Sequence, residues 1–198
     1  MLGKLRKLIN SLAPTTVGKA LYKAGVTPDE LTYMGLALSA LAPLAVYLGK
    51  LIALPFLILL AGLMDVLDGA VARASGRTTA FGSYLDSMTD RVSDAFLFLA
   101  MALAGVNQYI TLIALAFSLM VSYARAKGEL LNVKMEGVGL AERSERLIIL
   151  FVMSLLLLLR QLLVDDIIMA VVAVLAAATV IQRSVHVKRS IGQTRTTT

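Results

Sequence analysis

Four aspartates at regular spacing are the residues of this hydrophobic chain that are most suited to chemistry. Asp65 and Asp68 are three residues apart, and Asp86 and Asp90 are four apart. Residues three or four apart lie on the same face of an α-helix, so each pair is expected to point to one side of its helix. Carboxylate oxygens are hard ligands that favour Mg²⁺, Mn²⁺ or Ca²⁺. The spacing therefore predicts a site for divalent cations.

The segment between the two pairs predicts how they meet. Residues 75–79 have the composition of a turn. If the chain folds back there as a helix hairpin, Asp68 and Asp86 lie about equally far from the turn, and so do Asp65 and Asp90. An aspartate near the centre of a spanning helix costs about 2.5–3.5 kcal/mol. A bound pair of divalent ions would offset much of the cost of gathering four.

The rest of the sequence predicts that these aspartates lie at the ends of membrane helices. Of the 198 residues 58% are hydrophobic, above the ~45–50% that is usual in soluble domains. A spanning helix needs about 20 apolar residues. We expect an all-α polytopic membrane protein, one domain over residues 1–198, with six transmembrane helices. The apolar runs of the predicted spans are 31–49, 51–64, 83–104, 109–124, 147–164 and 167–181. The last turns of the second span carry Asp65, Asp68 and Arg73, and Arg160 interrupts the fifth.

The two ends of the chain are expected to differ from this core. Residues 1–25 contain leucines interleaved with four lysines and one arginine, which predicts an amphipathic helix in the membrane interface. Pro14 is expected to end its first helical stretch. Residues 190–198 are polar and predict a flexible tail. Asp165 and Asp166 fall in the loop predicted between the last two spans.

The charge pattern predicts orientation and excludes several kinds of chemistry. The net charge is +6, but the basic residues flank apolar runs, which favours a membrane surface over nucleic acid as the partner. With six spans, all but Lys50 and Arg160 of the 19 lysines and arginines lie on one side. We therefore expect an integral cell membrane protein whose termini and active site face the cytoplasm. The absence of cysteine excludes disulfides and cysteine nucleophiles.

The aspartates belong to a longer pattern, Asp65-x2-Asp68-Gly69-x2-Ala72-Arg73-x8-Gly82-x3-Asp86-x3-Asp90. This pattern resembles the signature of the CDP-alcohol phosphotransferase family at every fixed position. Enzymes of that family displace CMP from a CDP-linked lipid with an alcohol. They require Mg²⁺ or Mn²⁺ and are commonly homodimers. The resemblance therefore implies a membrane transferase of phospholipid biosynthesis that uses two divalent ions.

The resemblance also implies a role for each residue of the signature. Asp65, Asp68 and Asp86 are expected to bind metal. Asp90 resembles the general base, which also lies close to one metal and is counted among its ligands. The residues expected to contact the CDP-linked lipid are Thr32, Asp68, Gly69, Ala72, Arg73 and Gly82.

A second group of polar and basic residues points to the acceptor. It lies at the ends of the last three predicted spans, on the same side as the aspartates, and comprises Ser122, Arg125, Lys127, Arg143, Arg146 and Arg183. A cationic pocket beside a CDP site implies an acceptor that carries its own phosphate. The segments 122–129 and 139–147 resemble the branch of the family that uses inositol phosphate. Lysines and arginines at helix ends also serve simply as membrane anchors.

The expected reaction is therefore transfer of a phosphatidyl-type group from CDP-diacylglycerol or CDP-archaeol to inositol 1-phosphate, with release of CMP. Glycerol 3-phosphate is the first alternative acceptor, and unphosphorylated serine or inositol comes next. A cation or proton transporter would also place aspartates in the membrane, but spread through its depth. A purely structural membrane protein leaves the cost of the aspartate cluster unexplained.

Overall fold

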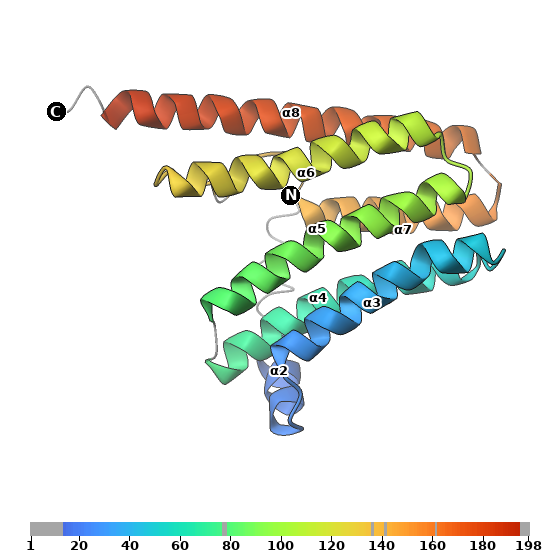
Figure 1. Cartoon of the computed structure of the whole chain (residues 1–198), viewed down its shortest axis with the longest axis horizontal. Helices are drawn as coiled ribbons and strands as arrows, with labels where there is room; N and C mark the ends of the chain where they lie inside the picture. The colour runs from blue at the N-terminus through green and yellow to red at the C-terminus, as the bar shows by residue number, and fades with distance from the viewer. Residues whose placement is uncertain (1–13, 77–78, 136, 141, 161, 195–198) are drawn as a thin grey trace. The chain divides into compact units, whose positions relative to one another are not determined.

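The computed structural model describes residues 14–76, 79–135, 137–140, 142–160 and 162–194. Within them the chain forms α-helices and no strand (Figure 1), which confirms the all-α prediction. The helices are α2 (Pro14–Lys23), α3 (Pro28–Tyr47), α4 (Ala53–Ser75), α5 (Ala80–Leu103), α6 (Gln108–Leu130), α7 (Arg143–Leu158) and α8 (Leu162–Thr194). They divide into two compact units that meet in sequence within α5, between Leu97 and Phe98.

The first unit is built around α4, which packs against both α2 and α3. Glycines allow these close approaches, as small residues do in membrane helices. A Cβ on Gly35 of α3 would lie 3.3 Å from the Cβ of Met64, and one on Gly18 of α2 would lie 2.5 Å from the carbonyl oxygen of Ala70. Both contacts flank the segment that carries Asp65 and Asp68, so that part of α4 is held from two sides.

The start of α3 is fixed by a capping box. Thr27 Oγ1 accepts a hydrogen bond from the backbone N–H of Glu30 at 3.3 Å, and the Glu30 carboxylate accepts one from the N–H of Thr27 at 2.8 Å. Pro28 occupies the first helical turn, where its lack of an N–H has no cost. This arrangement sets the position of Thr32 one turn further on.

The turn between α4 and α5 lies where the sequence predicts it. Gly76 caps the carboxyl end of α4 with φ 65°, the left-handed conformation that glycine adopts without strain. Thr79 Oγ1 then accepts a hydrogen bond from the backbone N–H of Gly82 at 2.9 Å, in the first turn of α5. Local turn and cap chemistry therefore defines both described sides of the connection between the helix of Asp65 and Asp68 and the helix of Asp86.

In the second unit α8 packs along α6 and also contacts α7. Asn107 begins α6: its side-chain oxygen accepts hydrogen bonds from the N–H groups of Tyr109 and Ile110. The N–H of Asn107 itself donates to Asp166 at 2.7 Å. This bond ties the start of α6 to the start of α8.

Four helices of the described chain are long and apolar enough to cross a membrane: Pro28–Tyr47, Ala53–Ser75, Gln108–Leu130 and Leu162–Gly192. Large apolar side chains on them are exposed, as lipid-facing residues are; Phe56 is 63% exposed and Leu112 is 64% exposed. The predicted number of six spans is not confirmed. Helices α5 and α7 form where two of the spans are predicted, but they are not among these four. Helix α7 has only 16 residues, and α5 carries four charged residues from Asp86 to Asp94.

Two predicted boundaries near the end of the chain are wrong. The stretch 147–164 is not one helix, because α7 ends at Leu158 and Arg160 adopts a positive φ of 56° before α8 begins. Asp165 and Asp166 accordingly belong to the first turns of α8 rather than to a loop. Acidic residues are favourable there because the amino end of a helix carries a partial positive charge.

The predictions for the two ends of the chain are corrected in part. Pro14 begins α2, as expected for a residue without an N–H at a first helical position, and the helical stretch predicted before it lies outside the described residues. Helix α8 continues to Thr194, so the first half of the predicted tail is helical. Residues 1–13 and 195–198 lie outside the described part of the chain.

Candidate active site

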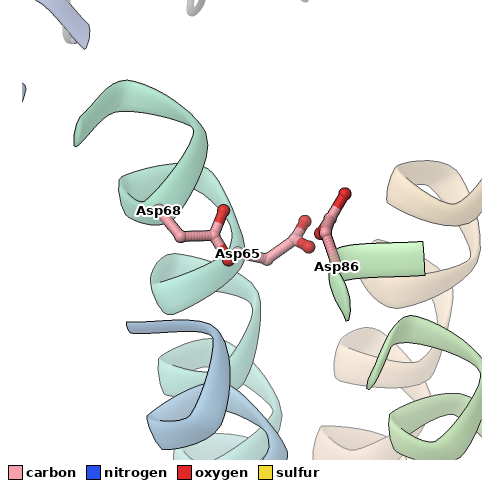
Figure 2. Close-up of side chains that lie close together, drawn as sticks. All are labelled: Asp65, Asp68 and Asp86. Carbon is pink, nitrogen blue, oxygen red and sulfur yellow. The ribbon is translucent and has the colours of Figure 1, made fainter. Parts of the chain in front are cut away.

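Three of the four aspartates converge across the α4–α5 hairpin. Asp65, Asp68 and Asp86 each offer one carboxylate oxygen, and these oxygens all lie within 4.8 Å of one another. Figure 2 shows Asp65 and Asp68 extending from α4 toward Asp86 on α5. The helical spacing and the turn thus produce the cluster that the sequence predicts. Three hard oxygen donors at this separation suit a divalent cation such as Mg²⁺ or Mn²⁺.

Burial differs among the three and makes the case for a cation stronger. Asp68 is 7% exposed, Asp65 is half-buried and Asp86 is partly exposed. The Asp68 carboxylate accepts a hydrogen bond from Thr32 Oγ1 at 2.8 Å. A neutral hydroxyl satisfies one lone pair but does not cancel a buried negative charge that has two like charges beside it. A bound divalent ion would cancel it, so the donor set fits the metal that the sequence predicts.

Asp90 does not join this cluster. It lies one turn beyond Asp86 on α5, and its Oδ2 is 3.5 Å from Nη1 of Arg91, which also donates to the carbonyl of Ser87. The structure therefore gathers three of the four residues predicted as metal ligands. A carboxylate beside the cluster but outside it suits a group that takes up a proton.

The small residues of the signature line the same end of the hairpin. A Cβ on Gly69 would lie 3.0 Å from Nη1 of Arg73, so the guanidinium of this exposed arginine folds back over Gly69. Ala72 is half-buried one turn after Asp68. A Cβ on Gly82 would lie 3.9 Å from Oδ1 of Asp29.

Asp29 is a residue of this region that the sequence analysis does not assign to the site. It lies in the first turn of α3 and approaches the first turn of α5 at Gly82. No helical spacing connects it with the signature, because 53 residues separate Asp29 from Gly82. The proline–aspartate pair at the start of a predicted span is the only sequence feature that could have drawn attention to it.

Three of the residues predicted to bind the acceptor lie near the end of α6. Ser122 is half-buried, whereas Arg125 and Lys127 are exposed. Nε of Arg125 donates to the carboxylate of Glu129 at 2.9 Å, and Nζ of Lys127 lies 5.7 Å from the ring centroid of Tyr123. Both cations thus have local partners, and exposed pairs of this kind contribute little to stability.

Arg146 and Arg183 are buried, with 2% and 4% of their surface exposed. Arg183 donates from Nε to the carbonyl of Val138 at 2.8 Å and from Nη1 to the carbonyl of Val121 at 2.6 Å. These bonds fasten the α6–α7 connection and α6 to α8, a structural role that the sequence analysis does not foresee. Two basic residues, Arg125 and Arg146, and two acidic residues, Glu129 and Glu142, lie close enough to interact with the charge of Arg183. The second unit therefore gathers three of the predicted cations.

Comparison with known proteins identifies the family. The sequence matches the CDP-alcohol phosphatidyltransferase family over residues 25–182, which include the whole signature. The chain belongs to this family. It is accordingly a CDP-alcohol phosphatidyltransferase, a transferase of phospholipid biosynthesis, and the resemblance on which the sequence analysis relied is confirmed.

Relatives of this phosphatidyltransferase carry a narrower description. The archaetidylinositol phosphate synthase of Pyrococcus horikoshii is 39% identical over 156 residues, which are 78% of this chain and 82% of the relative. The crystal structure of Mycobacterium tuberculosis phosphatidylinositol phosphate synthase with CDP-DAG bound has a TM-score of 0.76 and 31% identity, covering 88% of this chain and 93% of that one. The same enzyme in complex with manganese and citrate has the same TM-score and identity, with 88% of each chain covered.

Proposed function

We propose that this phosphatidyltransferase moves a phosphatidyl-type group from a CDP-linked lipid to inositol 1-phosphate and releases CMP. The observation that carries the proposal is the convergence of Asp65, Asp68 and Asp86 at the end of the α4–α5 hairpin. Relatives named for inositol phosphate products support the choice of acceptor. The CDP-DAG in the mycobacterial structure supports the choice of donor.

Each residue of the first unit then has a chemical task. Asp65, Asp68 and Asp86 hold two Mg²⁺ or Mn²⁺ ions, which when bound offset the charge of the diphosphate and of the departing CMP. Arg73, folded over Gly69, reaches the diphosphate with charge-assisted hydrogen bonds. Asp90 accepts the proton of the acceptor hydroxyl as that oxygen attacks phosphorus. The small side chains of Gly69, Ala72 and Gly82 leave room for the nucleotide, and Thr32 lies beside Asp68.

The proposal includes the setting of the reaction. Six spans, with α5 and α7 counted among them, would place both termini and the aspartates at the cytoplasmic face, where CDP-lipids and phosphorylated alcohols are available. The basic residues at one set of helix ends support this orientation. A homodimer in the membrane is part of the same proposal, because it is common in the family.

The decisive experiment measures CMP release by the purified full-length protein. The donors are CDP-diacylglycerol and CDP-archaeol, and the acceptors are inositol 1-phosphate, glycerol 3-phosphate, inositol and serine. We expect release with inositol 1-phosphate and either donor, and at least about tenfold less with inositol, because the loss of one charge-assisted contact costs about 1.5–3 kcal/mol. Preference for glycerol 3-phosphate would replace the proposed acceptor with its main alternative.

Arg143→Ala is expected to raise the KM for the acceptor phosphate by about tenfold or more, because a charged hydrogen bond contributes about 1.5–3 kcal/mol. The KM for the CDP-lipid should change little. Steady-state kinetics with each substrate varied in turn measures both values. Arg189→Ala removes an exposed cation of α8 outside the predicted pocket and is the control. Equal increases in both KM values for Arg143→Ala would contradict the assignment.

A further inference from the structure

Resting on the proposed function, we infer that Thr32 is a positioning residue that orients the metal ligand Asp68. From the sequence, Thr32 is expected only to contact the CDP-lipid. The structure adds a direct contact between its hydroxyl and the most buried carboxylate of the cluster.

The bond joins two helices and is shielded from water. Thr32 Oγ1 on α3 donates to Oδ2 of Asp68 on α4 at 2.8 Å, and the two residues are 9% and 7% exposed. The hydroxyl also lies 3.1 Å from the carbonyl oxygen of Pro28. A hydroxyl has one hydrogen to donate, and a bond to an ionised oxygen is the stronger of the two. The hydrogen therefore belongs mainly to the carboxylate.

The position of the hydroxyl is fixed by the packing around it. The capping box of Thr27 and Glu30 defines where α3 begins, and Gly35 lets α3 lie against α4 at Met64. Threonine is β-branched and has few χ1 conformations inside a helix. The donor consequently stays at one place relative to α4, and it restricts rotation of the Asp68 carboxylate.

This restriction has a consequence for metal binding. With one lone pair of Oδ2 engaged by Thr32, the remaining lone pairs of Asp68 are held toward Asp65 and Asp86. Groups that orient the ligands of a metal typically contribute 10–100-fold to its affinity. Thr32 is thus expected to influence the metal site before any CDP-lipid is bound.

The test is a titration of detergent-solubilised full-length protein with Mn²⁺, without CDP-lipid, in which electron paramagnetic resonance reports free Mn²⁺. Thr32→Val keeps the shape and removes the hydroxyl, and it should weaken binding by about tenfold or more. Thr32→Ser restores the hydroxyl and should bind within a few-fold of the unmodified protein. Thr111→Val is the matched control, because Thr111 is also a buried helical threonine but its hydroxyl donates to the carbonyl of Asn107.

A fourth variant, Asp86→Asn, separates failure of this inference from failure of the proposed function. If Asp86→Asn loses Mn²⁺ binding while Thr32→Val binds like Thr111→Val, the positioning role is overturned and the metal site stands. If Asp86→Asn binds Mn²⁺ as the unmodified protein does, the proposed function itself fails. Equal losses in Thr32→Val and Thr32→Ser would also overturn the role, since only one lacks the hydroxyl. Thr32→Ala replaces Thr32→Val if thermal unfolding shows that the valine is not tolerated.

Discussion

Replacing Asp90 with asparagine is expected to lower CMP release by about 10²–10⁴-fold, the range that general acid–base catalysis contributes. Asparagine has nearly the same shape but cannot take the proton of the acceptor hydroxyl. Because Asp90 lies outside the cluster formed by Asp65, Asp68 and Asp86, its loss should leave binding of the metal and the CDP-lipid largely intact. Single-turnover CMP release and equilibrium binding of the CDP-lipid measure the two quantities separately.

Asp94→Asn is the control for this substitution. Asp94 lies one turn further along α5 and is 4% exposed. Its replacement is therefore the same aspartate-to-asparagine change on the same helix. It should retain far more activity than Asp90→Asn. Normal turnover in Asp90→Asn would remove the assignment of the base. Parallel loss of turnover and metal affinity would instead make Asp90 a ligand.

Asp86→Asn is expected to lower CMP release strongly without lowering the Tm of the metal-free protein. Neutralising one of three neighbouring carboxylates removes like-charge repulsion, so the metal-free Tm should stay equal or rise. The increase in Tm that Mn²⁺ produces by binding the folded state should be lost. CMP release should fall by more than about 100-fold, beyond the effect of groups that only orient ligands.

These quantities are measured by thermal unfolding with EDTA or with Mn²⁺, and by CMP release at several metal concentrations. Asp86 is preferred over Asp68 for this test because it is partly exposed, so that its replacement disturbs packing less. Asp166→Asn serves as the control, since Asp166 lies in α8 and bonds to the N–H of Asn107. A metal-free Tm well below that of the unmodified protein would show that the carboxylates stabilise the fold without ions.

The clustered carboxylates are the part of the site that could be predicted from sequence alone. Spacings of three and four residues determine which side chains share a helix face, and Gly76 determines where α4 ends. Both are local properties of the backbone, so Asp65, Asp68 and Asp86 converge as expected. The apolar helices could be predicted for the same reason. The exceptions are the end of α7 and the start of α8, because the runs of residues on both sides of the turn at Arg160 are apolar and give no sign of the break.

Other features were decided by tertiary packing. Asp90 lies outside the group of three carboxylates, although its spacing from Asp86 is that of a shared face. The donor to Asp68 comes from 36 residues away, and Arg183 bonds to carbonyls 45 and 62 residues away. Periodicity along one helix carries no information about which distant donor meets which acceptor. Those pairings depend on how closely helices approach, and in the first unit Gly35 and Gly18 allow the close approach of α3 and α2 to α4.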